Sequence, residues 1–276
     1  MPLPKNNQAS WDQRIERAQE LAKTYPFASE ILSFYAQIAA FQQSLSAGLK
    51  SGSGNGAEQT GQRAFRDCLD LAPLLRSVAP LLALVKRVAP PALAQAAEQL
   101  AAEEPDYWEY LLTSYWESEG HVVDGAPEMH LFFARAMLQP YAENLAASRE
   151  MELPRFGPPA CPICTGKPLV GVLREEGHGA KRSLVCSLCL TEWDYRRVIC
   201  PACGEERFEK LAAYTASQFE HVRVEACDTC KVYIKTVDLT KNGLAIPVVD
   251  ELATLPLNLW AQENGYAKLQ VNLLGM

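Results

Sequence analysis

Apolar residues recur at helical spacing through most of the first 150 positions of the chain. Ser10-Trp11-Asp12-Gln13 has the form of a capping box, which predicts a helix from there to about Lys23, stopped by Pro26. A second helix is expected from about Ala28 to Leu49, because its apolar residues fall on one face. The glycine- and serine-rich stretch 51–56 that follows predicts a loop.

Prolines divide the rest of this half into shorter helices. Several are expected between Phe65 and Leu100, separated at Pro73, Pro80, Pro90 and Pro91. Pro105 and Pro127 suit the first turns of two further helices, the second with a break or kink at Pro140. Their aromatic residues are interpreted as core packing, since they repeat at helical spacing.

The polar and apolar pattern changes after the proline- and glycine-rich stretch 153–159, where we expect a domain boundary. Two similar units follow. Each has a C-x-x-C turn, a short apolar strand, a polar tip, a second apolar strand and another C-x-x-C turn. The first tip is expected over 174–182. A last strand is predicted over 233–239, and then a C-terminal helix over 248–263, bent at Pro256, with Leu252, Leu255, Leu259 and Trp260 on one face.

Eight of the nine cysteines lie in these turns, and they are the candidate metal ligands: Cys161, Cys164, Cys186, Cys189, Cys200, Cys203, Cys227 and Cys230. Two C-x-x-C pairs supply four thiolates, the full shell of a tetrahedral ion. The gaps within each unit are 21 and 23 residues, against 10 between the units. We therefore expect the first four cysteines to form one group and the last four another.

A shell of four thiolates leaves no open position for water or substrate, which favours a structural or electron-transferring site over a hydrolytic one. Thioredoxin-like redox pairs and iron–sulfur clusters are the alternatives. The first lacks the βαβ context it needs, and the second has less regular spacing. Ligand identity alone does not separate zinc from iron.

The remaining candidate residues have simpler interpretations. Cys68 is expected to be a small core residue, and His121, His130, His178 and His221 structural or surface residues. The stretch 191–197, with Trp193 and two arginines, is either a connector that covers the metal units or a contact patch for a partner.

The net charge of −7 is unevenly distributed. Residues 1–152 carry 12 Lys and Arg against 19 Asp and Glu, whereas residues 153–240 carry 12 against 11. Neither part has the basic surplus of a nucleic-acid binder. The N-terminus lacks the apolar region of a signal peptide, and no apolar run is long enough to span a membrane. These features predict a cytoplasmic protein, in which paired cysteines serve as metal ligands rather than disulfides.

The cysteine half resembles a known family. Leu184 to Trp193 reads L-x-C-S-L-C-x-T-E-W, Arg197 to Gly204 reads R-x-x-C-x-x-C-G, Val222 to Cys230 reads V-R-V-E-A-C-x-x-C, and Y-x-K follows at Tyr233 to Lys235. These motifs, with the C-terminal stretch ending at Tyr266, look like those of the FdhE-type formate dehydrogenase accessory proteins. One departure is Thr165, where such a turn often has Gly.

The resemblance implies rubredoxin-like metal units with all eight cysteines as ligands, and favours iron over zinc. The expected fold class is α+β multidomain. An all-α N-terminal domain (1–152) precedes two tandem rubredoxin-like (zinc-ribbon-like) metal modules (153–198 and 199–243) and a C-terminal helical segment (244–276).

The resemblance also implies a function. We expect a maturation factor, or chaperone, that binds the catalytic subunit of formate dehydrogenase, is needed for its activity and is not itself an enzyme. The alternative is a rubredoxin-like redox protein that donates electrons during formate dehydrogenase assembly. Binding of nucleic acid is not expected, and formation of a homodimer stays open.

Overall fold

The helical part starts at a capping box. In a computed structural model, which describes residues 9–52, 64–118, 125–149, 156–177 and 179–276, the Ser10 side chain accepts a hydrogen bond from the Gln13 backbone N–H, and the Gln13 side chain accepts one from the Ser10 N–H. Helix α1 (Trp11–Thr24) therefore begins and ends where the sequence predicts.

The other N-terminal helices are separated near the predicted boundaries. A 3₁₀ turn (η1, Pro26–Ala28) leads into α2 (Ser29–Gly52), which continues two residues into the stretch expected to be a loop; residues 53–63 lie outside the described ranges. The next elements are η2 (Phe65–Cys68), α4 (Leu71–Leu75), α5 (Val78–Val88), α6 (Pro91–Leu100), α7 (Pro105–Glu117) and α8 (Glu128–Ala147). Helix α8 runs through Pro140 without a break.

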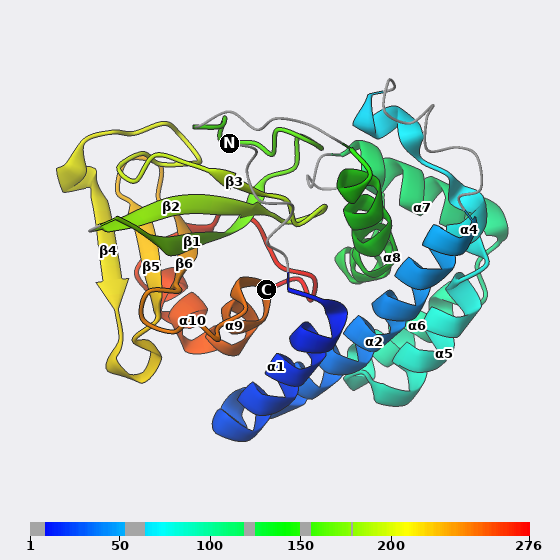
Figure 1. Cartoon of the computed structure of the whole chain (residues 1–276). Helices are drawn as coiled ribbons and strands as arrows, with labels where there is room; N and C mark the ends of the chain where they lie inside the picture. The colour runs from blue at the N-terminus through cyan, green and yellow to red at the C-terminus, as the bar shows by residue number, and fades with distance from the viewer. Residues whose placement is uncertain (1–8, 53–63, 119–124, 150–155, 178) are drawn as a thin grey trace.

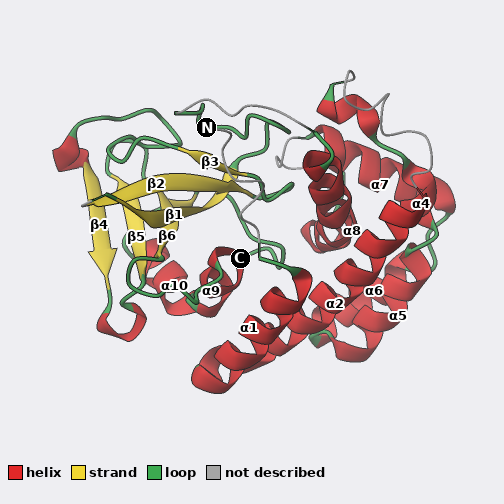
Figure 2. Ribbon diagram, viewed as in Figure 1, coloured by secondary structure: helices red, strands yellow, loops and turns green. Residues whose placement is uncertain are grey.

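The second half forms a sheet beside these helices (Figure 1; Figure 2). Its elements are β1 (Pro168–Glu176), β2 (Gly179–Cys186), β3 (Glu192–Asp194), η3 (Phe208–Lys210), β4 (Leu211–Thr215), η4 (Ser217–Phe219), β5 (Val222–Cys227), β6 (Val232–Asp238) and β7 (Ala267–Lys268). The polar tip expected over 174–182 is wrong, because β1 and β2 stay paired as far as Glu176 and Gly179.

One seven-stranded sheet joins the two cysteine units. Its strand order is β3-β2-β1-β6-β5-β4, with β7 paired to β6. The hairpin of the first unit meets the second unit where β1 runs parallel to β6, with Gly171 opposite Thr236. The predicted fold class of helical region, cysteine-bearing strands and C-terminal helices is confirmed, and the shared sheet is an addition to it. The residue ranges proposed for the four parts of the chain stay a prediction.

The predicted C-terminal helix is two helices, α9 (Pro247–Ala253) and α10 (Leu255–Glu263). They separate at Thr254, and Pro256 lies in the first turn of α10, where its missing N–H costs nothing. The predicted apolar face is wrong at Leu259, which is 60% exposed, whereas Leu257 is buried.

Two buried clusters hold these parts together. The larger contains the cores of the N-terminal helices, α9 and the first four cysteines. The smaller fills the space between the sheet and α10, with Val170, Val224, Val237 and Leu257 among its residues. Figure 1 shows α9 and α10 beneath the sheet, with α9 next to α1.

Buried ion pairs connect the ends of the chain. The Arg17 guanidinium lies 2.7 Å from the carboxylate of Asp250 in α9, and Arg14 lies 2.9 Å from Glu143 in α8. Arg135 of α8 also donates a hydrogen bond to the Asn272 carbonyl. Within the described residues, no helix combines the length and the apolar character that crossing a bilayer requires.

Candidate metal centres

The four C-x-x-C turns share one backbone geometry. The residue directly after each second cysteine has a positive φ: Thr165 (64°), Leu190 (54°), Gly204 (76°) and Lys231 (56°). In three of the turns its N–H donates to the carbonyl of the first cysteine, at 2.9 to 3.0 Å. This left-handed residue closes a turn that directs both sulfurs to the same side. Thr165 therefore takes the conformation that Gly204 takes in the second unit.

The first group joins Cys161, Cys164, Cys186 and Cys189. The sulfurs of Cys161 and Cys189 are 3.6 Å apart, and those of Cys164 and Cys186 are 3.4 Å apart. All four residues are buried. A Cβ at Gly166 would lie 3.2 Å from the Cys186 sulfur, so the chain passes this group at close range.

The helical part covers this first group. Arg66, in η2, donates a hydrogen bond to the Cys164 carbonyl at 2.9 Å, and Gln139 of α8 donates one to the Ser187 carbonyl at 3.2 Å. The four cysteines belong to the same buried cluster as the helices. The first group thus lies at the junction between the helices and the sheet.

The second group joins Cys200, Cys203, Cys227 and Cys230 and is more accessible. The sulfurs of Cys200 and Cys230 are 3.8 Å apart, and those of Cys203 and Cys227 are 3.7 Å apart. Cys203 is exposed and Cys230 is half-buried. The backbone N–H of Ala202 points at the Cys200 sulfur at 3.3 Å, a contact that spreads thiolate charge.

Both groups fit a tetrahedral ion. With metal–sulfur bonds of about 2.3 Å, the sulfurs of a regular tetrahedron are about 3.8 Å apart, close to the distances in both groups. The four ligand atoms of each group lie within 4.8 Å of one another. The grouping expected from the spacing is therefore the grouping in the structure, and each set could hold one metal ion.

The electrostatics of the first group favour a bound cation. Hydrogen bonds from the neighbouring thiols, Cys161 first among them, lower the pKa of Cys164. Burial raises the pKa of Cys186 and of Cys189. Without a cation, four buried sulfurs this close cannot all be thiolates, since like charges oppose one another in a low dielectric. A divalent ion supplies the charge that removes the remaining protons.

The other sequence candidates that the structure describes belong to neither group. Cys68 is a buried residue whose thiol donates to the Ala64 carbonyl. His130 is buried against the Tyr107 hydroxyl, and His221 contacts the Asp250 carboxylate at 2.8 Å. His121 and His178 lie outside the described residues.

Trp193 belongs to the core rather than to a surface patch. It is 1% exposed, its indole N–H donates to the Pro158 carbonyl, and it lies directly over Gly157. Arg196 is on the surface beside Glu206. Within the stretch 191–197, Trp193 therefore covers the first unit, as the connector interpretation expects.

Two charge clusters on the sheet, one buried and one partly buried, were missed in the sequence. Arg182 and Arg223 both pair with Glu225, and Lys235 and Lys268 both pair with Glu251. Arg223 and Glu225 are two apart on a strand, which places them on one face and was an available signal. Nothing local to Lys235 indicates that its side chain is fully buried.

Comparisons with known proteins agree with this arrangement. Two family models match, described as "FdhE, central domain" over residues 160–197 and "FdhE, C-terminal domain" over residues 198–274. A "Protein FdhE homolog" of Aquifex aeolicus is 31% identical over 271 residues, which is 95% of this chain and 94% of the relative. The chain belongs to the FdhE family.

Other members of the FdhE family support the assignment. A "Protein FdhE homolog" from Pectobacterium carotovorum is 26% identical over an alignment that covers 97% of this chain and 87% of the relative. The crystal structure of the FdhE protein from Pseudomonas aeruginosa superposes with a TM-score of 0.74 at 25% identity, covering 99% of this chain and 98% of that one. The resemblance that the cysteine motifs indicate is thus confirmed along the whole chain.

Proposed function

We propose that this FdhE-family protein is an accessory factor that binds the catalytic subunit of formate dehydrogenase and is needed for that enzyme's activity. The observation that carries the proposal is the pair of closed four-cysteine groups in a member of this family. Four sulfurs fill a tetrahedral shell, so neither group offers a coordination position at which a substrate could react. In this proposal the protein works in the cytoplasm and catalyses no step itself.

The eight cysteines are the proposed ligands, one ion to each group, with iron the expected metal and zinc the alternative. The two ions would have different tasks. The first would hold the helical part and the sheet together, because the backbone carbonyl of Cys164 accepts a hydrogen bond from η2 and that of Ser187, between two of the ligands, accepts one from α8. The second would stabilise an accessible surface, since Cys203 is exposed. That surface is the better candidate for contact with the enzyme subunit.

Copurification with the catalytic subunit tests this proposal. Cys203→Ser, in the second group, should lower recovery of the subunit and the formate dehydrogenase activity of a strain that lacks the native protein. Cys68→Ser is the matched control, because Cys68 belongs to neither group. Equal recovery and equal activity with both variants would remove the second group from the mechanism.

A redox role is the second candidate, and the exposure of Cys203 favours it. An accessible M(Cys)₄ iron could exchange electrons with a partner faster than a buried one, because the distance to the partner is shorter. Protein purified without oxygen should then show a visible spectrum that bleaches with dithionite. A colourless protein with two equivalents of zinc would rule out the redox role.

A further inference from the structure

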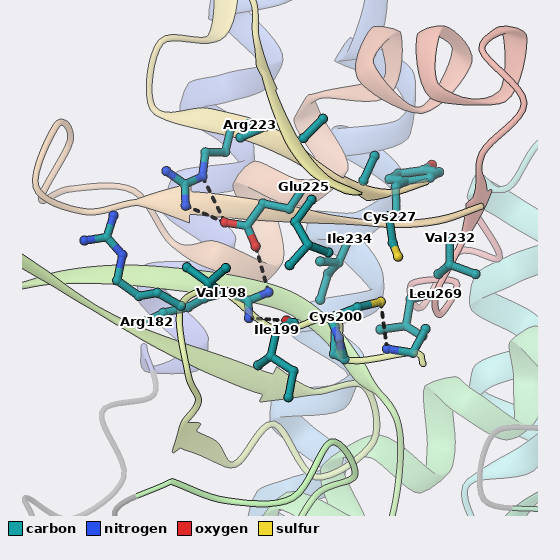
Figure 3. A pocket seen from close by; sticks show the side chains of 18 of the residues that line it. Arg182, Val198, Ile199, Cys200, Arg223, Glu225, Cys227, Val232, Ile234 and Leu269 are labelled. Carbon is teal, nitrogen blue, oxygen red and sulfur yellow. Dashed lines mark hydrogen bonds and ion pairs between the residues drawn. The ribbon is translucent and has the colours of Figure 1, made fainter. Parts of the chain in front are cut away.

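A cavity of about 440 Å³ lies beside the second cysteine group (Figure 3). It is formed by β4, β5 and the start of β6 together with the connector 197–202. Arg223, Glu225 and Cys227 line it, and they alternate along β5 with residues that face α10. The volume falls in the range of small-molecule sites, about 300–1,000 Å³.

Most of the cavity wall is apolar. Ile199, Val232, Ile234 and Leu269 form part of it. Two further apolar lining residues are open to solvent, Phe208 at 78% and Val198 at 44%. A wall of this kind favours a ligand with a hydrocarbon body.

One end of the cavity is charged. Arg182, 2% exposed, lies 2.7 Å from a Glu225 oxygen, and Arg223 pairs with the other oxygen of the same carboxylate. Arg197 also lines the cavity, and its guanidinium donates to the Ala180 carbonyl. The lining residues at this end thus carry three arginines and one carboxylate. The Nε of Arg182 is buried and has no hydrogen-bond partner among the described residues. This end therefore has positive charge and a donor that the protein itself leaves unsatisfied.

The charged end and the cysteines lie on opposite sides of the cavity. Figure 3 shows Arg223 and Glu225 at one side and Cys200 and Cys227 at the other, with Ile234 between them. An anion at the arginines would thus be separated from the negative charge of a thiolate-bound metal. Guanidinium groups bind carboxylates through paired, charge-assisted hydrogen bonds.

We propose that this cavity binds a small organic carboxylate. Its carboxylate contacts Arg182 and Arg223, and its apolar body lies along Ile199, Val232 and Ile234. All the lining residues belong to this chain, so binding of the carboxylate does not require the formate dehydrogenase subunit. Its position next to Cys200 and Cys227 makes the second metal centre the neighbour of the bound molecule.

The test compares octanoate with octanamide, its neutral counterpart, on the full-length metal-loaded protein by calorimetry. Octanoate should bind with a stoichiometry of one and at least about tenfold more tightly than octanamide, the ratio expected for charge-assisted hydrogen bonds. Arg223→Gln should remove most of that preference. Arg196→Gln, a surface arginine that does not line the cavity, is the matched control and should keep it.

A second variant tests the place of binding rather than its charge. Ala213 lines the cavity and is exposed, so Ala213→Phe adds a ring at the opening with little cost to folding. It should weaken both probes about tenfold or more. Melting temperature and metal content check that each variant is folded. Equal affinity for acid and amide, no saturable binding of octanoate, or unchanged binding to Ala213→Phe would each overturn the proposal.

Discussion

Gly171 is the point where the two cysteine units are joined, and replacing it with alanine tests that junction. It lies in β1 directly opposite Thr236 of β6. A Cβ on Gly171 would clash with the Thr236 hydroxyl oxygen, because the two atoms would be closer than their van der Waals radii allow. It would also lie 3.3 Å from the Cβ and from the methyl carbon of Thr236. Rotation of the threonine side chain would move its hydroxyl but not its Cβ, which would stay 3.3 Å from the added methyl group.

The cost follows from the burial of this contact. Thr236 is fully buried, so the added methyl group can be accommodated only if β1 and β6 move apart. Overpacking of this kind costs about 1–3 kcal/mol. For a chain of this size, each kcal/mol lowers the melting temperature by about 2–4 °C. We expect Gly171→Ala to melt about 4–8 °C below the unchanged protein for a loss near 2 kcal/mol.

Scanning calorimetry of the metal-loaded protein measures this effect. Gly48→Ala is the matched control, because a Cβ there meets nothing within 4 Å, and in helix α2 alanine is favoured over glycine by up to about 1 kcal/mol. Adding Thr236→Ala to Gly171→Ala should restore part of the loss. An unchanged melting temperature in Gly171→Ala, or strictly additive losses in the double variant, would refute the reasoning.

Three further results are expected. A chromogenic chelator should remove the metal of the second group well before that of the first, because Cys203 is exposed while the first group is buried. Release of two equivalents in a single phase would contradict this. Glu251→Gln should lower the free energy of unfolding in urea by about 3–5 kcal/mol, since it leaves the buried ammonium groups of Lys235 and Lys268 without a counter-charge, and a loss below about 1 kcal/mol would count against the pairing. Burial alone would raise the pKa of Glu251, but Lys235 and Lys268 lower it to about 2. The stability it contributes is therefore present above about pH 4.5 and lost as the pH falls from there toward 2, and acid unfolding of Glu251→Gln should lack this component.

The sequence predicts the cysteine groups well because their geometry is local. Each C-x-x-C turn needs only a few residues, and the residue that follows, such as Gly204 or Thr165, closes it by its own backbone conformation. The hairpins then return the second turn beside the first. The helices of the first half are equally local, since prolines such as Pro91 and Pro105 define where they begin.

The features that were missed depend on contacts between distant residues. The pairing of β1 with β6 joins Val170 to Lys235, and neither strand has a local signal for that partner. Lys235 is buried only because α9 places Glu251 within 2.9 Å of it. Leu259 is exposed because α10 is a separate helix that turns Leu257 toward the sheet instead. These outcomes follow from tertiary packing, which periodicity does not report.

The ion pair between Arg17 and Asp250 affects the order in which parts of the chain fold during synthesis. The two residues are 233 positions apart, so Glu20 of its own helix can pair with the Arg17 guanidinium early, whereas Asp250 is available only when nearly the whole chain has left the ribosome. The hairpin carrying the first four cysteines, by contrast, closes over fewer than thirty residues. Nascent chains should therefore capture their first metal early and dock α1 onto α9 late. A translation arrest placed before Asp250 would leave a metal-bearing intermediate in which α1 can pack on α2 and pair with Glu143 but has no α9 to contact.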